Sequence, residues 1–359
     1  DIKIPAFPPF AVIIFYAGAA VYFASKNKGN SKEVIARSPE SFRDDKAITK
    51  ETGLRRFARN DKIGYVMVIT VIAASLVIYF VSTVFQKKPD IAVTYLDVGQ
   101  GDGAVVELPD KKVVVMDTGR SGREAAAFLK YLGMKSIDAL VLSHADSDHA
   151  GGTDYLTARF KVKEMWDSGR IIYQEANSTG IVHRILERGD VVEGKGYKMY
   201  VFHPYREFYT MNGDSDNGGN NSSLVLRIEG RKKTFLFTGD IEEEAQEDII
   251  HLGKWLKSDV VKVPHHGGRT SAYKPFYDVA SPEIAVISVG RDNSFGHPHQ
   301  DTLDMLEGAK IYRTDMNGAV KITEKDGRLE VKTHRDYRFS KTKSLAGEIK
   351  NIQRLFRVW

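Results

Sequence analysis

The chain has 359 residues, a length that suits one large domain or two ordinary ones. It contains no cysteine, which excludes disulfides and thiolate-ligated metal sites. Its formal net charge is only +5, so the overall charge does not by itself require a nucleic-acid partner. The sequence starts at Asp1 without a methionine, and we expect it to be the C-terminal part of a longer protein.

Two uncharged apolar runs lie in the first quarter of the chain. One covers residues 4–24, and three prolines at its start shorten the expected helix to about residues 8–24. The other runs over residues 63–85. Each run reaches the length of about 18 to 20 residues at which a helix crosses the hydrocarbon core of a bilayer. We therefore predict two transmembrane helices, with buried core helices as the alternative.

The linker between these runs is basic. Residues 26–62 contain eleven Lys or Arg against six Asp or Glu. Basic residues in short loops favour the cytoplasmic side of a membrane. We therefore expect residues 1–89 to form a membrane domain with a cytoplasmic linker, and the chain after Phe85 to lie on the extracytoplasmic face.

From Asp90 onward, short apolar runs alternate with Gly, Asp and Asn, which predicts strands and turns. The expected strands are Ile91–Leu96, Ala104–Leu108, Lys112–Met116, Ile137–Leu142, Val162–Trp166, Lys198–Phe202, Ser223–Ile228, Thr234–Phe237, Val260–Val263 and Ile284–Val289. The expected helices are Arg123–Leu132, one after His149, Ile181–Gly189, Glu242–Leu256 and Gln300–Glu307. Strands in two batches, each followed by helices, predict an α/β fold in which two sheets pack face to face with helices outside.

The stretch 143–152, SHADSDHAGG, concentrates four potential metal ligands within six residues. These are His144, Asp146, Asp148 and His149. They follow the apolar run Ile137–Leu142, which is typical of a buried strand. Imidazoles and carboxylates crowded onto one turn would repel or waste one another unless a cation gathers them. The stretch therefore predicts a metal site, with a polar surface loop as the alternative.

Further residues with metal-binding or acid–base chemistry follow other apolar strands. They are Asp117, Asp240, His265, His266 and His297. Ligands drawn from several strand ends can meet at one edge of a sheet, which is how an α/β scaffold builds a site. Each residue alone could be an ordinary loop residue, whereas all of them together indicate a shared centre.

At these residues the chain resembles the metallo-β-lactamase superfamily. His144, Asp148 and His149 match its His-x-His-x-Asp-His motif, in which Asp146 takes the place of the second histidine. Several longer motifs resemble, more specifically, the ComEC family of DNA-internalisation competence proteins. They are LDVGQGD (96–102), NNSSLVL (220–226), TGD (238–240), VPHHG (263–267) and the pattern Tyr312-x-Thr314-Asp315-x-x-Gly318.

The resemblance implies a metallo-β-lactamase-like αββα sandwich over residues 90–331, preceded by the two transmembrane helices. It implies the following metal ligands: His144, Asp146, Asp148, His149, Asp240 and His265. His266 is the alternative to His265 as the last ligand. Asp148, His266 and His297 are the implied catalytic residues, the two histidines as phosphate contacts or proton donors. Asp117 would orient a ligand imidazole.

The histidine of the third metallo-β-lactamase motif is absent, and Asn220 and Asn221 are the candidates to replace it. More oxygen and less nitrogen among the ligands shifts the preference from zinc towards harder ions. We therefore expect one or two divalent metal ions, manganese or zinc, with magnesium as a further option.

The C-terminal segment 332–359 carries eight Lys or Arg against two acidic residues. Its apolar residues recur at helical spacing and predict an amphipathic helix. A terminal helix docked on the domain is one interpretation, and a basic face for DNA phosphates or lipid headgroups is the other.

The resemblance favours a membrane-anchored, metal-dependent phosphodiesterase or nuclease of DNA uptake in natural transformation, which degrades the strand that is not imported. The implied partners are DNA, the lipid bilayer, the upstream part of the same membrane protein and other DNA-uptake components. One alternative is a non-catalytic DNA-transport module. Another is a hydrolase of the same fold that acts on cell-envelope phosphodiesters, because fold alone does not fix the substrate.

Overall fold

The computed structural model describes residues 66, 69–78, 90–171, 180–211 and 219–335. The chain divides into two compact units, residues 1–87 and residues 88–359. Each unit is described by itself.

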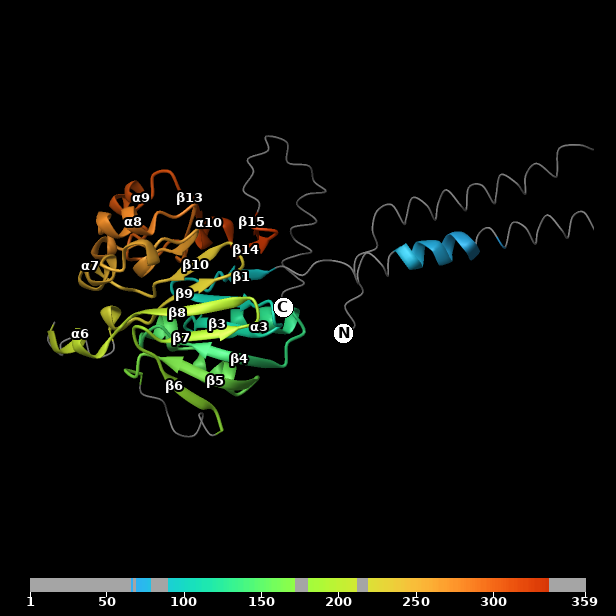
Figure 1. Ribbon diagram of the computed structural model, residues 1–359, viewed down its shortest axis with the longest axis horizontal. Coiled ribbons are helices and arrows are strands. Elements are labelled where there is room, and N and C mark those ends of the chain that lie inside the picture. Colours follow the sequence, from blue (N-terminus) through green and yellow to red (C-terminus); the bar gives the residue numbers. More distant parts are fainter. Residues whose placement is uncertain (1–65, 67–68, 79–89, 172–179, 212–218, 336–359) are drawn as a thin grey trace, which may run out of the picture. The chain divides into compact units, whose positions relative to one another are not determined.

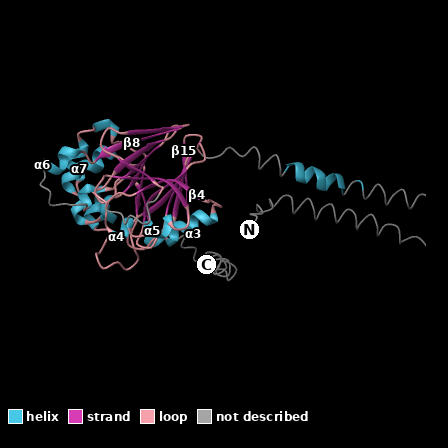
Figure 2. Cartoon of the chain, turned by 90° about the horizontal axis from the view of Figure 1, so that it is seen from below, coloured by secondary structure: helices cyan, strands magenta, loops and turns pink. Residues whose placement is uncertain are grey.

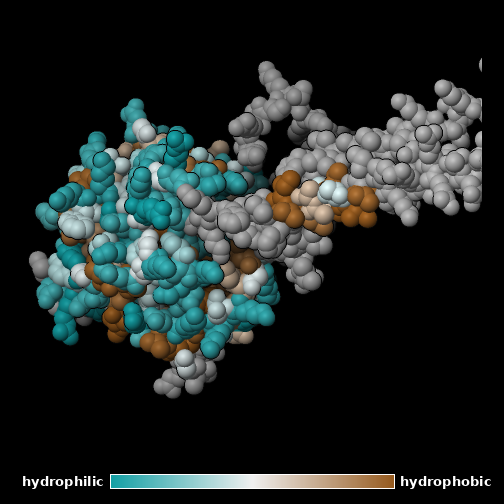
Figure 3. Space-filling view, turned by 45° about the vertical axis from the view of Figure 1, so that its right-hand side comes forward, coloured by the Kyte–Doolittle hydropathy of each residue, from teal (hydrophilic) through white to brown (hydrophobic). Residues whose placement is uncertain are grey.

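In the first unit, residues 66 and 69–78 are helical, and the Thr70 hydroxyl donates a hydrogen bond to the Val66 carbonyl oxygen. The apolar side chains on this segment are largely exposed (Figure 3), with Ile69 at 64% and Val77 at 60%. Within the described ranges, no helix has the length and apolar character needed to span a bilayer. The spans predicted at about 8–24 and 63–85 lie wholly or largely outside the described residues.

In the second unit, the described residues form two sheets. The order in the eight-stranded sheet is β15 (Arg328–Thr333), β14 (Val320–Lys325), β1 (Ile91–Tyr95), β2 (Gly103–Glu107), β3 (Val113–Thr118), β4 (Ser136–Val141), β5 (Lys161–Asp167) and β6 (Val182–Ile185). The order in the seven-stranded sheet is β13 (Lys310–Arg313), β12 (Ile284–Ile287), β11 (Val260–Lys262), β10 (Thr234–Phe237), β9 (Val225–Glu229), β8 (Tyr197–His203) and β7 (Val191–Gly194).

The strands of each sheet divide into an antiparallel and a parallel part (Figure 1). Strands β3 to β6 are parallel in the first sheet, and β10 to β13 are parallel in the second. The remaining neighbours pair antiparallel, including the β9–β10 hairpin. Ligands of open α/β sheets bind at the carboxyl ends of parallel strands. The parallel parts therefore mark the edge where a site is expected.

Short helices connect and cover these strands. They are α3 (Arg123–Tyr131), α4 (Ser147–Ala150), α5 (Thr153–Thr157), α6 (Arg206–Met211), α7 (Glu243–Ile250), α8 (Lys274–Ala280), α9 (Gln300–Met305) and α10 (Thr314–Asn317). Four single turns of 3₁₀-helix occur at Asn220–Ser222, Gly253–Trp255, Pro264–Gly267 and Arg269–Ser271.

Three buried apolar clusters define the layers. The central cluster lies between the sheets and joins residues such as Val106 and Phe235. A second cluster packs α3 and α5 against the outer face of the first sheet, for example through Leu129 and Leu140. A third packs α7 and α8 against the outer face of the second sheet, for example through Ile249. Helices therefore cover the outer faces of two stacked sheets (Figure 2), which is the predicted αββα sandwich.

Two predicted helices differ from the structure. Residues 181–189 do not form a helix, because Val182–Ile185 is an edge strand that pairs in parallel with β5. Its apolar spacing suits either structure, but β-branched residues and an available neighbouring strand favour β6. The helix expected over 242–256 ends at Ile250, and the chain turns at Gly253, whose φ is +53°. Strands β7 and β13 to β15 and helices α6, α8 and α10 were not expected from the sequence.

Candidate metal centre

The candidate centre lies at the carboxyl ends of strands from both sheets. His144 follows β4, and His149 lies on the following turn of helix, α4. Asp240 follows β10, and His266 lies in the 3₁₀ turn after β11. All four residues are buried, at 3% exposure or less. The parallel strands of the two sheets thus deliver these side chains to one place.

In each of the three histidines, Nδ1 contacts a neighbouring oxygen of the protein, which leaves Nε2 available to bind an ion. The Nδ1 of His149 lies 3.0 Å from Asp117 Oδ2, and the Nδ1 of His266 lies 2.8 Å from the carbonyl oxygen of Ser288. The Nδ1 of His144 lies 3.1 Å from the hydroxyl of Ser143. Metal-binding histidines are oriented in this way by a hydrogen bond to the nitrogen that does not bind the ion.

The Nε2 atoms of these three histidines are buried and make no hydrogen bond to any described residue. Two of them lie close to one atom, Asp240 Oδ2, at 3.1 Å from His149 and 3.3 Å from His266. Two ligands each about 2.1 Å from a tetrahedral ion are about 3.4 Å apart. The donor atoms therefore have the type and the spacing of a metal site.

Four overlapping groups of side chains could hold an ion. They are His144–His149–Asp240, Asp148–His149–His266, Asp102–Asp117–His149 and Asp102–Asp240–His266. Asp148 faces the group from α4, with its Oδ2 3.5 Å from His266 Nε2. His149 belongs to three of these groups, and Asp102, Asp240 and His266 belong to two each. The groups therefore overlap in one compact centre.

Asp117 and Ser143 orient the candidate ligands His149 and His144. The Asp117 carboxylate accepts hydrogen bonds from the backbone N–H of Ser143 at 2.7 Å and from its hydroxyl at 2.8 Å. The same carboxylate faces His149, so one aspartate sets both the loop after β4 and a ligand ring. Ser223 acts similarly from the other sheet, because its hydroxyl accepts the backbone N–H of Asp240 at 3.0 Å.

Asp102 and Lys262 are buried in the centre, and neither was among the residues expected there. Lys262 forms an ion pair with Asp102 and donates to Asp240 Oδ1 at 3.2 Å and to the Gly239 carbonyl oxygen at 2.9 Å. The ammonium is thereby shared by two carboxylates. The sequence carried a signal for Asp102, which ends the motif LDVGQGD, but Lys262 resembles any strand lysine.

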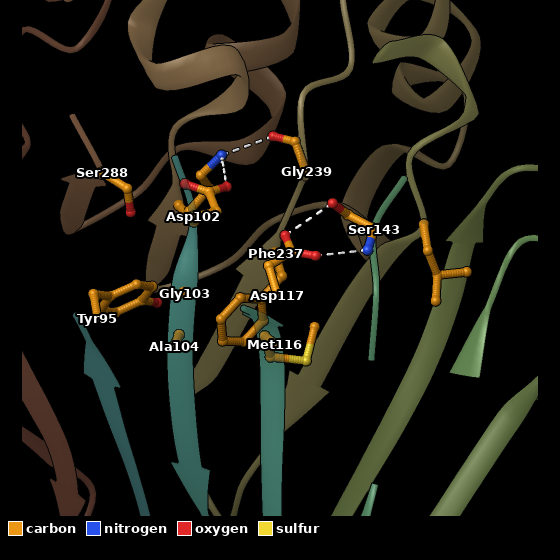
Figure 4. Close-up of a pocket in the computed structure, with 12 residues that line it drawn as sticks. Tyr95, Asp102, Gly103, Ala104, Met116, Asp117, Ser143, Phe237, Gly239 and Ser288 are labelled. Carbon is orange, nitrogen blue, oxygen red and sulfur yellow. Dashed lines mark hydrogen bonds and ion pairs between the residues drawn. The ribbon is translucent and has the colours of Figure 1, made fainter. Parts of the chain in front are cut away.

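A small cavity of about 20 Å³ lies next to Asp117 and Ser143, the residues that contact the histidines (Figure 4). It is lined by polar residues such as Asp102, Asp117 and Lys262 and by apolar residues such as Tyr95 and Phe237. A space of this size holds one water molecule and no more. A substrate must therefore approach the ligands from the outer side of the loops.

The structure separates the roles expected of His265 and His266. Both have positive φ, +47° and +53°, a backbone conformation that is rare outside glycine. The reversed turn directs His266 to the centre, whereas the Nδ1 of His265 lies 3.1 Å from Glu242 Oε1. Among the described groups that could hold an ion, His266 is present and His265 is not. The geometry therefore assigns the last ligand position to the alternative, His266.

Other expected site residues lie at the rim. The side chain of Asp146 is 56% exposed and lies 3.6 Å from His144 Nε2. The amides of Asn220 and Asn221 are bonded to Glu242 and Glu244, so they are directed away from the ligand atoms. Both asparagines are thus engaged with glutamates at the rim.

His297 also lies next to the centre. Its ring is 6.3 Å from that of His266 and 5.6 Å from that of His265. It does not belong to the described groups that could hold an ion.

Comparisons with known proteins agree with this geometry. A family model described as the metallo-beta-lactamase superfamily matches residues 96–197. ComE operon protein 3 from Bacillus subtilis is 31% identical over 263 residues, which cover 65% of this chain and 33% of that protein. Competence protein ComA from Neisseria gonorrhoeae is 30% identical, with coverages of 74% and 37%. The chain belongs to the ComEC family of competence proteins.

This ComEC-family chain spans about one third of the length of the curated relatives that it matches. Among solved structures, the metallo-beta-lactamase fold protein YhfI from Bacillus subtilis is 11% identical with a TM-score of 0.43. That match covers 65% of this chain and 99% of the other. The fold of this superfamily implies that the protein binds a divalent metal ion. The histidine and aspartate groups at the centre fit such an ion.

The charges in the centre stabilise one another. Burial alone would lower the pKa of His149, but the carboxylates of Asp240, Asp117 and Asp102 raise it to about 10. Burial opposes ionisation of Asp240, yet the imidazoles of His149 and His266 hold its pKa well below the usual value. His266 behaves as His149 does, since Asp240 outweighs burial and raises its pKa. Without metal, the centre is thus a set of paired charges.

We predict that metal uptake releases protons. At about pH 7, His149 and His266 in the metal-free chain each carry the extra proton that their raised pKa values imply, whereas a coordinating imidazole is neutral. Adding manganese should release about two protons per chain, and the apparent affinity should rise from about pH 6 to about pH 8. Proton release into a weakly buffered indicator solution measures this. An affinity that does not change with pH would contradict it.

We also predict that Lys262 stabilises the metal-free centre. Lys262→Met leaves Asp102 and Asp240 without their cation and should lower the free energy of unfolding by about 3–5 kcal/mol. The matched control is Lys274→Met, which breaks an exposed pair with Asp278 and should change it by about 0–1 kcal/mol. Urea unfolding with chelator present compares them. Equal losses in the two variants would show that Lys262 has no such role.

Proposed function

We propose that this sandwich is a metal-dependent phosphodiesterase, a deoxyribonuclease that degrades the strand which is not imported during DNA uptake. The observation that carries the proposal is the presentation of three buried Nε2 atoms around Asp240. The names of the relatives, which refer to competence, supply the process.

Five residues would hold the ion or ions: His144, Asp148, His149, Asp240 and His266. A divalent cation at this position lowers the pKa of a water ligand and polarises phosphate oxygens. Among these five residues, Asp148 and Asp240 supply carboxylate oxygen, which suits manganese, and the three histidines supply imidazole nitrogen, which suits zinc. We therefore expect the ion to be manganese or zinc.

The neighbouring residues would contact the substrate. Burial, together with the nearby imidazoles of His265 and His266, lowers the pKa of His297 to about 4. His297 is therefore neutral at physiological pH and can donate one N–H to a phosphate oxygen, but it is not charged as an acid. His265 is partly exposed and is held by Glu242 and by the Thr270 hydroxyl, which places it at the rim where a leaving oxygen would emerge.

The membrane placement belongs to the same proposal. We infer that residues 1–89 anchor the chain through two transmembrane helices, with the basic linker in the cytoplasm and the sandwich on the extracytoplasmic face. The charge difference between the linker and the flanking segments supports this orientation. The exposed apolar side chains on the described part of the second predicted span support the membrane anchoring.

The purified 359-residue chain should cut single-stranded DNA without sequence preference, because contacts to phosphate carry no sequence information. Chelation should stop cleavage, and added manganese or zinc should restore it. His149→Ala and Asp240→Ala should each reduce turnover by at least about a thousandfold, since each removes a ligand. His251→Ala, which changes an exposed histidine at the end of α7, is the matched control.

The outcome also separates the alternatives. A folded, metal-saturated chain that retains DNA but never cuts it would contradict the nuclease and support a transport module. Cleavage of lipid or cell-wall phosphodiesters in preference to DNA would instead indicate a cell-envelope hydrolase. Unchanged cleavage in the Asp240→Ala variant would show that the ligand set is wrong.

The topology can be tested because the chain has no cysteine. We expect Lys254→Cys, an exposed position after α7, to react with a membrane-impermeant thiol reagent in whole cells. Ser41→Cys in the basic linker should react only after lysis. The opposite pattern would place the sandwich in the cytoplasm.

A further inference from the structure

Phe295 is an exposed aromatic residue beside the metal centre. It lies in the loop between β12 and α9, and 56% of its surface is accessible. Its ring is 5.6 Å from the ring of His297 and inclined to it by 31°. The ring of His297 is in turn 6.3 Å from that of His266 and inclined by 30°. Two steps between roughly parallel rings therefore connect Phe295 to a candidate metal ligand.

The loop that carries Phe295 is fixed by hydrogen bonds. The Asn293 side chain donates to the carbonyl oxygens of Gly290 at 3.0 Å and His297 at 2.8 Å, and it accepts the backbone N–H of His297 at 3.0 Å. Gly290 is anchored by the side chain of Gln100. The ring is thus presented by an ordered loop, although the core does not bury it.

An exposed basic residue follows the glycine next to His297. Gly268 lies against His297, because a Cβ at this position would be 3.1 Å from His297 Nε2. The next residue, Arg269, is exposed. Phe295 offers an aromatic face and Arg269 a guanidinium, and these are the two features that proteins use for single-stranded nucleic acids, a base platform and a phosphate contact.

We propose that Phe295 stacks on the base of the nucleotide adjacent to the phosphate at the centre, and that the site therefore takes unpaired strands. A base in a duplex is already stacked and paired, whereas a base in a single strand can turn onto an aromatic ring. The position of the phosphate rests on the proposed function, but the stacking contact itself requires no cleavage.

Binding by the 359-residue chain to a labelled single-stranded oligodeoxynucleotide tests the proposal, with an abasic strand of the same length as the second probe. Fluorescence anisotropy is recorded with manganese and with chelator. Phe295→Ala should weaken binding of the base-containing strand about tenfold and leave the abasic strand unchanged. Phe295→Trp should restore it. Tyr131→Ala, which removes an exposed aromatic ring from α3, should have no effect.

Two results would overturn the stacking contact. One is a wild-type chain that does not distinguish the two strands, and the other is an equal loss for both strands in Phe295→Ala. Cleavage kinetics then separate this inference from the nuclease proposal. If the chain cuts DNA, Phe295→Ala should raise KM and leave kcat nearly unchanged. If Phe295-dependent binding occurs in a folded chain that never cuts, the stacking stands and the nuclease fails.

Discussion

The mutual neutralisation of buried charges around Asp240 is the interaction on which this structure depends. Asp240 has one oxygen on the Lys262 ammonium and the other between two imidazoles. An unpaired charge in such a buried position would cost several kcal/mol. Lys262 and His266 come from the end of β11 in one sheet, and His149 lies in α4 after β4 of the other, so the charges are satisfied only when the two sheets pack together. The centre is therefore a condition of the fold as well as its site.

The division of the Asp240 carboxylate also bears on how many cations the centre can take. Lys262 already donates a hydrogen bond to Oδ1 of Asp240. It also neutralises Asp102, whose Oδ1 lies 3.5 Å from Nδ1 of His266. Only Oδ2 faces the free Nε2 atoms of His149 and His266. The lysine thus supplies a fixed positive charge on one side of the carboxylate, and a metal ion would supply the other. The position where a metal ion can replace the protons of the imidazoles is therefore at Oδ2 of Asp240, beside His149 and His266.

The sequence predicted the layers and most of the ligands because both follow from short-range patterns. Apolar runs placed the strands, and polar residues directly after them placed His144, His149 and Asp240 at one edge. Periodicity could not decide between helix and strand for β6, where the apolar spacing fits both. Nor could it separate His265 from His266, since two consecutive positive φ values determine which ring turns inward. The sequence could not identify Lys262, because its partners Asp102 and Asp240 follow other strands.

The contrast between the interior and the rim gives the site its direction. The small cavity next to Asp117 and Lys262 has room for one water molecule. The loops after β11 and β12 carry His265, His297 and Phe295, and the ring of His297 lies 5.6 Å from each of the other two. A compact substrate would meet only the ligands, whereas a long chain of phosphates must cross these loops. The outer residues can therefore discriminate between substrates without changing the ligands, which is how one metal scaffold serves different reactions.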